Sequence, residues 1–387
     1  MTPKDRPLSE CINSPATTAY SDARARLPLP WVYQAFTHLT SALLALHRQL
    51  QPKNLPVQLI DGSTKRLRPY GDIPKNFKPH RTRSRQAYWC LARIVATFCA
   101  QTGIATAARI ACYTVSEQAL AVQLFLQSTT PTLYIGDRNF GVWRVVRAAV
   151  QGGGHALMRL TAVRARRLLG QKALPDSLDL PLTWSATQHD QVDAGLHKAP
   201  VRGRLLIVRT HRRGYRPQTL CLFSTLTDVK AYPPERLLEL YGWRWRAELN
   251  WRTVKSTLQM DQSECKSADM VRKEFYAGLM AYNLVRALMA TAAAQSGCTA
   301  AELSFSKSHL LLAAVLKELF LASISVAERN RRLAWLLAET ATAKLPRRRK
   351  PRPDEPRAQH HRPAVYPKLR CSRAQARQAL QKCRLKS

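Results

Sequence analysis

The stretch from residue 241 to residue 255 reads YGWRWRAELNWRTVK, and it decides how the rest of the chain is interpreted. It carries a tyrosine, an arginine, a glutamate and a lysine at offsets 0, 3, 7 and 14, namely Tyr241, Arg244, Glu248 and Lys255. On one continuous α-helix these residues fall within about 60° of one another, because offsets of three, four and seven return to the same face. One carboxylate then lies in a row of groups that can bind phosphate.

An apolar stripe lies beside this row and can pack on a core. It consists of Leu240, Trp243, Ala247, Trp251, Val254 and Leu258. The simplest interpretation is an ordinary amphipathic helix, in which Arg244 and Glu248 form an i,i+4 pair on a solvated face. The spacing favours a functional helix instead, because this tetrad should arise by chance on the order of once in several hundred chains of this composition.

The chain carries a large positive charge. Lysine and arginine number 61 against 25 acidic residues, and the net charge of +36 is distributed along all 387 residues. This charge is typical of a protein that binds a polyanion over much of its surface. A membrane surface is the alternative partner, but Asn283 and Arg286, and further on Lys317 and Glu318, interrupt the apolar stretches. We therefore expect neither a membrane partner nor a small-molecule substrate.

The compartment is predicted from the first ten residues and from the cysteines. Residues 1–10 are polar and lack the apolar segment of a secretory signal. The nine cysteines are scattered without a C-x-x-C pair, which fits reduced thiols better than a disulfide framework or a zinc site. We expect a cytoplasmic protein.

The first part of the chain predicts a helical module followed by strands. Residues 14–50 have a helical pattern whose apolar face consists of Trp31, Phe36, Leu39, Leu43, Leu44 and Leu46. Alternation from Val57 predicts a short strand that ends at Asp61 and is stopped by Gly62. Residues 88–99 and 104–113 predict a β-hairpin around Thr102 and Gly103.

The next part predicts alternating helices and strands. Ser116 is expected to cap a helix, and a strand over 132–136 precedes Asp137. A helix over 142–150 and a strand over 155–160 follow. This order predicts a mixed α/β sheet, in which polar residues at the carboxyl ends of strands converge where ligands bind.

Residues 162–234 break this rhythm. They are loop-rich and polar at first, and then contain two β-type runs, 204–210 and 219–226, around a basic turn, so we expect a β-rich insertion. After the stretch quoted first, helices are predicted over 270–294, 308–322 and 326–339. Residues 344–387 form a basic, proline-containing tail that is expected to contact phosphates.

Asp61, Asp137 and Glu248 are three carboxylates from three distant segments. Each aspartate alone is more simply a turn residue, and the Asp61-Gly62 pair in particular has that composition. Together they suit phosphodiester cleavage, because two divalent ions about 3.5–4 Å apart can stabilise both the attacking and the leaving oxygen. Mg²⁺ prefers oxygen ligands, so two or three carboxylates and a substrate phosphate can hold it.

With these residues in place, the chain resembles the DDE transposases of bacterial insertion sequences, in the IS-four family that includes the transposases of Tn-five and Tn-ten. The resemblance rests on Asp61 in IDGS, Asp137 in IGDRNF, and the 241–255 signature, and it spans residues 55–370. The segments 274–286, with AYNLVR, and 366–369 also resemble that family. One departure is Asn139, which stands where a glycine is commoner.

The resemblance implies a fold, which is an α/β protein with a ribonuclease-H-like catalytic core interrupted by a β-rich insertion and flanked by helical regions. We expect a helical DNA-binding region at 1–53, core segments at 54–161 and 235–296, the insertion at 162–234, and a helical region with a basic tail at 297–387.

The resemblance also implies cut-and-paste transposition. Asp61, Asp137 and Glu248 would be catalytic and would hold two Mg²⁺ ions, for which Mn²⁺ can substitute. The substrates would be double-stranded DNA with terminal inverted repeats and a target DNA, bound by a homodimer near the bacterial nucleoid. Water would nick one strand, and the freed 3′ hydroxyl would attack the opposite strand to give a hairpin. The hairpin would then be reopened before strand transfer.

The same resemblance implies contacts with DNA. Tyr241, Arg244 and Lys255 would hold phosphates, and Trp245 would stack on an extruded base, although Trp245 is equally well explained as a core aromatic. Trp184 and Tyr215 are both candidates for a second stacking aromatic.

Two other classes of function compete with catalysis. A DNA-binding protein without catalysis, such as a transposase remnant acting as a repressor or an architectural protein, explains the charge equally well. It has no need of all three carboxylates and the tetrad. An RNA-binding structural protein explains neither these residues nor the long apolar helices.

Overall fold

The computed structural model describes residues 18–48, 55–81, 86–128, 130–188, 190, 192–210, 218–321, 323–346 and 371–384. The described residues up to 346 belong to one compact unit. Helix α13 (Arg373–Arg384) belongs to a second unit and is described by itself. The segment 366–369, which carries part of the resemblance, lies outside the described residues.

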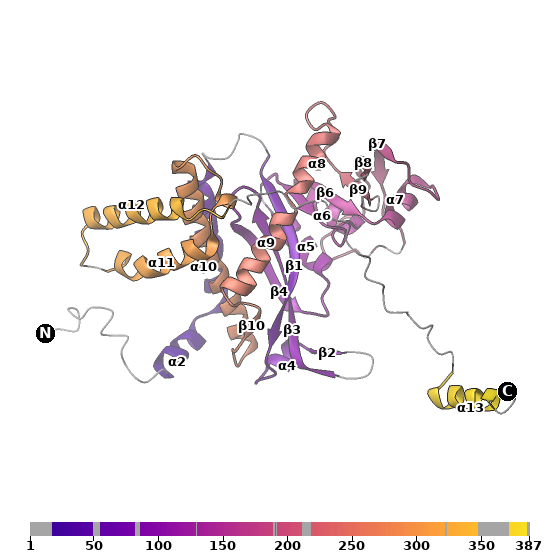
Figure 1. The fold of residues 1–387 in the computed structure, drawn as a ribbon, viewed down its shortest axis with the longest axis horizontal. Coiled ribbons are helices and arrows are strands. Elements are labelled where there is room, and N and C mark those ends of the chain that lie inside the picture. Colours follow the sequence, from indigo (N-terminus) through magenta and orange to yellow (C-terminus); the bar gives the residue numbers. More distant parts are fainter. Residues whose placement is uncertain are drawn as a thin grey trace. The chain divides into compact units, whose positions relative to one another are not determined.

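One sheet runs through the main unit (Figure 1), and the described part of the chain contributes ten strands to it. Eight of them follow one another in the order β2 (Pro79–Arg81), β3 (Gln86–Cys99), β1 (Val57–Leu67), β5 (Leu133–Gly136), β6 (His155–Leu160), β9 (Gln218–Ser224), β8 (Val201–Thr210) and β7 (Ser177–Trp184). The other two are β4 (Ala105–Cys112), which pairs with β3, and β10 (Gln262–Ser263), which pairs with β1. Strands β1, β5 and β6 are parallel, and β3 is antiparallel to β1. The prediction of a mixed α/β sheet is confirmed.

Apolar residues cover both faces of this sheet, because successive side chains of a strand point to opposite sides. Leu59 and Ile135 face a core shared with α3 (Leu29–Leu46), α9 (Trp245–Arg252) and α10 (Ala268–Gln295). Ile60 and Tyr134 face a second core with α5 (Glu117–Leu126) and α6 (Trp143–Gln151). The faces are called the α9 face and the α5 face below.

Strand β1 is longer than the sequence predicts. It continues through Gly62 to Leu67, because β3 pairs with it from Gln58 opposite Cys99 to Leu67 opposite Cys90. A short local pattern contains no information about such a distant partner strand. Asp61 therefore lies inside β1 and not at its end.

The predicted elements from the hairpin to β6 are confirmed. β3 and β4 form the hairpin, and Gly103 takes a φ of +77° in its turn. Ser116 caps α5, because its Oγ accepts a hydrogen bond from the Ala119 amide at 3.1 Å. Helix α6 and strand β6 follow as expected.

Residues 162–234 contain more regular structure than predicted. Helix α7 (Ala162–Leu169) comes first, and the strands β7, β8 and β9 extend the sheet beyond β6 in antiparallel pairs. The sequence does not predict β7, because this outer strand contains Pro181 and buries only Trp184 fully, so its apolar alternation is weak. The basic turn at 212–215, with Tyr215, lies outside the described residues.

The prediction of one regular α-helix over 241–255 is confirmed only in part, because the backbone stays in the helical region at Trp243 and Arg244 but the hydrogen-bond pattern changes there. The chain forms α8 (Pro234–Gly242), a turn at Trp243 and Arg244, α9, and the π-helical turn η3 (Thr253–Thr257). Hydrogen bonds to the third preceding residue replace the usual α-helical pattern in the turn, for example from the Arg244 amide to the Tyr241 carbonyl at 3.0 Å. Gly242, a poor helix former, makes this break less costly.

Helices at both ends of the main unit surround α10. The amino-terminal helices are α2 (Thr18–Arg26) and α3, and Phe36 of α3 packs on Tyr276 of α10 with ring centroids 5.6 Å apart. Trp31 and Leu46, which the sequence assigns to the apolar face of this helix, are exposed instead. The carboxyl-terminal pair is α11 (Phe305–Leu319) and α12 (Val326–Thr342), and the short elements α4 (Ile73–Asn76) and η4 (Ala300–Glu302) complete the unit.

Helix α10 is long and apolar enough to pass for a membrane span, contrary to the sequence expectation. Most of that apolar window is nevertheless buried inside the protein. Its polar residues also have internal partners, since the Arg286 guanidinium donates to Asn250 Oδ1 at 2.6 Å. These features are those of a core helix.

Candidate active site

Asp61 of β1 and Asp137, the residue directly after β5, occupy equivalent positions relative to these two neighbouring strands. Leu59 of β1 pairs with Ile135 of the parallel strand β5, and each aspartate follows two residues later. Both side chains therefore point to the α9 face at the same level of the sheet. The sequence predicts this convergence even though it misplaces the end of β1.

Helix α9 is attached to β1 beside the first aspartate. Trp251 is 3% exposed and donates its indole N–H to the Asp61 carbonyl oxygen at 3.2 Å. Its ring also meets Phe98 edge to face, with centroids 5.4 Å apart. This contact holds α9 against β1 (Figure 1). Glu248, one turn earlier on α9, lies close enough to Asp61 for its negative charge to act on that carboxyl.

The three carboxylates act on one another electrostatically. The pKa of Asp61 is raised to about 7, mainly by burial, and the negative charges of Asp137 and Glu248 add to the shift. The hydrogen bond from the Gly62 amide and the charge of Arg244 oppose it. The site thus concentrates more negative charge than its own cations neutralise at Asp61.

Each carboxylate has one oxygen engaged. Asp61 Oδ1 accepts from the Gly62 amide at 2.9 Å, and Asp137 Oδ1 accepts from the Asn139 amide at 2.8 Å. Glu248 Oε1 accepts from Arg244 Nη1 at 2.5 Å. The predicted i,i+4 pair of Arg244 and Glu248 is therefore confirmed as a contact. The pair lies beside the two aspartates and not on a remote solvated face.

The donor set fits a hard divalent cation in its chemistry. It offers carboxylate oxygens only, and the raised pKa of Asp61 is the response expected of a buried acid near other acids. Within the described ranges, however, no three histidine, cysteine, aspartate or glutamate side chains lie close enough together to hold one ion. The Arg244 contact holds Glu248, so a shared ion requires this side chain to turn.

Tyr241 and Arg244 lie on the same side of the site. Tyr241 is 9% exposed, and its hydroxyl has no hydrogen-bond partner in the described part of the chain. Burial raises its pKa, while the nearby guanidinium groups of Arg244 and Arg159 lower it. A buried donor without a partner beside two guanidinium groups is suited to an incoming anion.

Arg159 is a residue that the sequence interpretation missed. Gly136 of β5 pairs with Met158 of β6, so Arg159 stands opposite the position of Asp137. A charged residue at the penultimate position of a buried strand was the available signal.

Lys255 reaches the site through η3. Its Nζ donates to Ser63 Oγ at 3.2 Å, and Ser63 shares the α9 face with Asp61 because the two are separated by one residue. The π-helical turn changes the direction of this side chain relative to a continuous α-helix. The tetrad is thus assembled by two helices, a turn and a π-helix.

The aromatic candidates differ in exposure. Trp245 is 52% exposed, with the Arg244 guanidinium 6.0 Å from its ring centre, so the interpretation as a core aromatic is wrong. Trp184 is 5% exposed and packs on Phe223 at 5.0 Å, so it cannot stack on a base without leaving the core.

The Asn139 substitution leaves the turn after β5 unstrained. Among the described residues, Gln259 is the one non-glycine position with positive φ. Asn139 therefore adopts a backbone conformation open to any L-residue.

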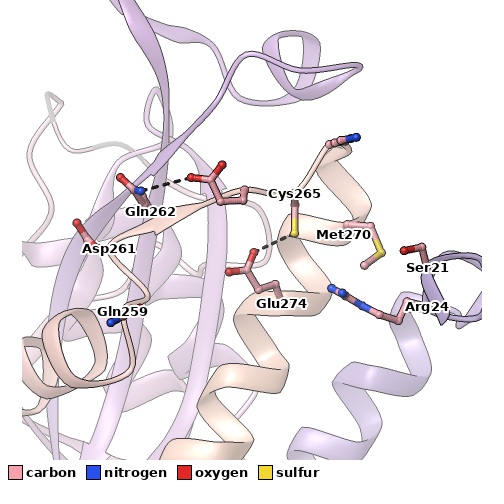
Figure 2. Close-up of a pocket in the computed structure, with 10 residues that line it drawn as sticks. Ser21, Arg24, Gln259, Asp261, Gln262, Cys265, Met270 and Glu274 are labelled. Carbon is pink, nitrogen blue, oxygen red and sulfur yellow. Dashed lines mark hydrogen bonds between the residues drawn. The ribbon is translucent and has the colours of Figure 1, made fainter. Parts of the chain in front are cut away.

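A cavity of about 1020 Å³ lies elsewhere, near β10 and the start of α10 (Figure 2). Its lining mixes Arg24 and Lys266 with Asp261, Glu264 and Glu274, and it contains none of the candidate residues. In Figure 2 Cys265 donates to Glu274, which also pairs with the buried Lys65. This mixed charge favours a structural role for the cluster.

Comparison with known proteins shows which family the chain resembles. A family model for a transposase DDE domain matches residues 52–284. The transposase InsG for insertion sequence element IS4 of Escherichia coli (strain K12) is 29% identical over 259 residues, which cover 65% of this chain and 55% of that protein. The chain thus matches little more than half the length of this relative. A piggyBac transposase, solved as a synaptic complex with hairpin DNA, aligns over 72% of this chain and 57% of its own with 9% identity and a TM-score of 0.41.

Proposed function

The chain belongs to the transposases with a DDE domain, and from this membership we propose that it catalyses cut-and-paste transposition of an insertion sequence of the IS4 family. In this proposal Asp61, Asp137 and Glu248 are the catalytic carboxylates. The observation that carries it is the matched register of the two aspartates on adjacent parallel strands, with α9 anchored to the backbone of the first.

The catalytic core is proposed to be ribonuclease-H-like. Its strands would be β4, β3, β1, β5 and β6 in spatial order, of which the first three are antiparallel and the last three parallel. The strands β7 to β9 would belong to an insertion between β6 and the catalytic helix. The domain boundaries stated above remain part of this proposal.

The three carboxylates would hold two Mg²⁺ ions, or Mn²⁺ in their place. When bound, such ions lower the pKa of an attacking water and stabilise charge on the leaving oxygen. Asp61 must lose its proton to serve as a ligand, and the adjacent Arg244 favours that form. Glu248 must exchange the Arg244 contact for the site, which releases the guanidinium to the substrate.

The released Arg244 is proposed to bind the phosphate beside the scissile bond, because its planar fork can donate two parallel hydrogen bonds. The unpartnered Tyr241 hydroxyl and the Arg159 guanidinium would donate to the same phosphate region. Lys255 would contribute a point charge from the other side of Asp61. Trp245, half exposed at the start of α9, would stack on an unpaired base.

The proposed partners are double-stranded DNA carrying the terminal inverted repeats, a target DNA, and a second copy of the chain in a synaptic dimer. The net charge of +36 supports DNA binding through phosphates. A cytoplasmic, nucleoid-associated location is proposed with it.

Cleavage of a plasmid that carries the coding region with its native flanking DNA tests this function. End-specific breaks are expected with Mg²⁺ and not with EDTA, and Asp61→Ala, Asp137→Ala and Glu248→Ala should each abolish them while end binding persists. Glu239→Ala is the matched control, since Glu239 is a glutamate of α8 paired with Arg236 in the same segment. Tight DNA binding by the wild type without any break would instead indicate a regulatory DNA-binding protein.

A further inference from the structure

Glu117 lies behind the site, on the α5 face of the sheet. It is the first residue of α5, and its side chain passes across Gly62 of β1. A Cβ atom built on Gly62 would come within 2.4 Å of Glu117 Cδ. Since Asp61 and Gly62 point to opposite faces, Glu117 lies directly behind the strand position that carries the Asp61 carboxylate.

Both oxygens of Glu117 are engaged. Oε1 accepts from Arg93 Nη1 at 3.1 Å, and Oε2 accepts from Asn139 Nδ2 at 2.6 Å. Arg93 is fixed in turn, because its Nε and Nη2 donate to the Tyr113 carbonyl. The carboxylate is therefore placed to hold other residues and not to bind a metal ion.

Asn139 belongs to the turn that carries Asp137. Its backbone amide donates to Asp137 Oδ1 at 2.8 Å, and its carbonyl accepts from Gln118 Nε2 at 2.9 Å. Neighbouring residues of α5 thus hold both the side chain and the carbonyl of Asn139. The start of α5 is itself fixed by the Arg144 guanidinium, which donates to Ser116 Oγ and Gln118 Oε1.

A chain of contacts consequently joins the two aspartates from behind, running from Gly62 through Glu117 and Asn139 to Asp137. We propose that Glu117 is a positioning residue, which fixes the Asp137 turn against β1 and so sets the spacing of the Asp61 and Asp137 carboxylates for a divalent cation. This inference rests on the proposed function. Residues that orient metal ligands typically change metal affinity or activity about 10–100-fold when they are replaced.

Mn²⁺ binding to the full-length protein tests the inference without DNA. It is measured as the decrease of the free-ion signal in electron paramagnetic resonance. The component of binding that disappears in Asp137→Asn defines the site. Glu117→Gln keeps the side-chain shape and Asn139→Ala keeps the backbone bond to Asp137, and each should weaken this component about 10–100-fold. Glu328→Gln is the matched control, because Glu328 is also a first-turn helix glutamate paired with an arginine, Arg332, but lies on α12.

Gly62→Ala is a second way to disturb the position of Glu117. The added methyl group must displace Glu117, and the flexible end of that side chain can move without disrupting the fold. Gly62→Ala should therefore weaken Mn²⁺ binding in the wild type and have little further effect in Glu117→Ala, which lacks the three atoms that the added methyl group meets at under 3 Å. Melting temperatures of all variants separate this effect from a general loss of structure.

Unchanged Mn²⁺ affinity in folded Glu117→Gln would overturn the inference, as would equal effects of Gly62→Ala in both backgrounds. A wild type without an Asp137-dependent Mn²⁺ site would overturn it as well. Failure of the proposed function gives a different result. If the protein binds Mn²⁺ in a Glu117-dependent way but never cuts DNA, the positioning role of Glu117 stands and the proposed catalysis is wrong. In a wild type that cuts DNA, high Mn²⁺ should restore cleavage by Glu117→Gln.

Discussion

Replacing Asn283 by alanine is expected to destabilise the main unit by about 3–5 kcal/mol. Asn283 is fully buried on α10, and its amide imitates the edge of a strand. Its Oδ1 accepts from the Ala105 amide at 2.8 Å, and its Nδ2 donates to the Ala105 carbonyl at 2.9 Å. A third bond joins Nδ2 to Thr40 Oγ1 on α3 at 3.0 Å.

The magnitude follows from the groups that the substitution leaves behind. Ala105 is fully buried and Thr40 is 2% exposed, so water does not replace the lost amide. A buried backbone donor and a buried acceptor without partners cost about 1–3 kcal/mol each, and the vacated volume adds to this cost. The loss spans three elements, because α10, β4 and α3 all meet at this side chain.

Hydrogen exchange at the Ala105 amide, combined with urea unfolding of the full chain, measures both the local and the global effect. A loss of 3 kcal/mol corresponds to a fall of roughly 100-fold in the protection of that amide. Asn330→Ala is the control, since Asn330 is an exposed residue within α12 and its change should stay within about 0.5 kcal/mol. A change below about 1 kcal/mol in Asn283→Ala would contradict a stabilising role for these buried hydrogen bonds.

Four further substitutions test the phosphate contact, the two tryptophans and the buried lysine. Arg244→Lys should lower the rate of single-turnover cleavage about 100-fold, while DNA-end binding falls much less, because a lysine cannot form the bidentate contact. Equal losses in both assays would indicate general phosphate binding by Arg244. Trp245→Ala should change the unfolding free energy by less than about 1 kcal/mol but reduce cleavage. Trp184→Ala should lower the unfolding free energy by about 3–5 kcal/mol. The reverse pattern would show that the assignment of the stacking aromatic is wrong. Lys65→Met should lower the free energy of unfolding in urea by about 3 kcal/mol. The buried Lys65 ammonium donates to the carbonyls of Met260 and Gln262 and to Glu274. An unchanged free energy would mean that repacking around the methionine compensates for the lost hydrogen bonds.

The sequence predicts the two aspartates well, because their signals are local. An alternating run followed by an aspartate places Asp61 and Asp137 on neighbouring strands, and parallel pairing brings them to one level. The length of β1 is not predictable in this way, since it depends on β3, whose partner residues lie some thirty positions away.

The tetrad shows a different limit. Its spacing suggests one helix, yet the chain breaks at Trp243 and Arg244 and ends in a π-turn at Lys255. These departures depend on tertiary contacts, such as the Arg246 guanidinium on the Ala100 carbonyl and the Trp251 indole on Asp61. On α3, Trp31 lies about 140° around the helix from Phe36, so the two residues do not share one narrow face, and the sequence interpretation was wrong to place both on the apolar side.

The metal specificity of Asp137→Cys in single-turnover DNA cleavage tests whether Asp137 binds the catalytic ion. A thiolate binds softer ions better than Mg²⁺, so the variant should be inactive in Mg²⁺ and regain cleavage in Mn²⁺, while the wild type works in both. Selective recovery in Mn²⁺ is expected, because it requires the side chain at position 137 to contact the catalytic ion. Cleavage by Asp137→Cys in Mg²⁺ at the wild-type rate would contradict the assignment of Asp137 as a metal ligand.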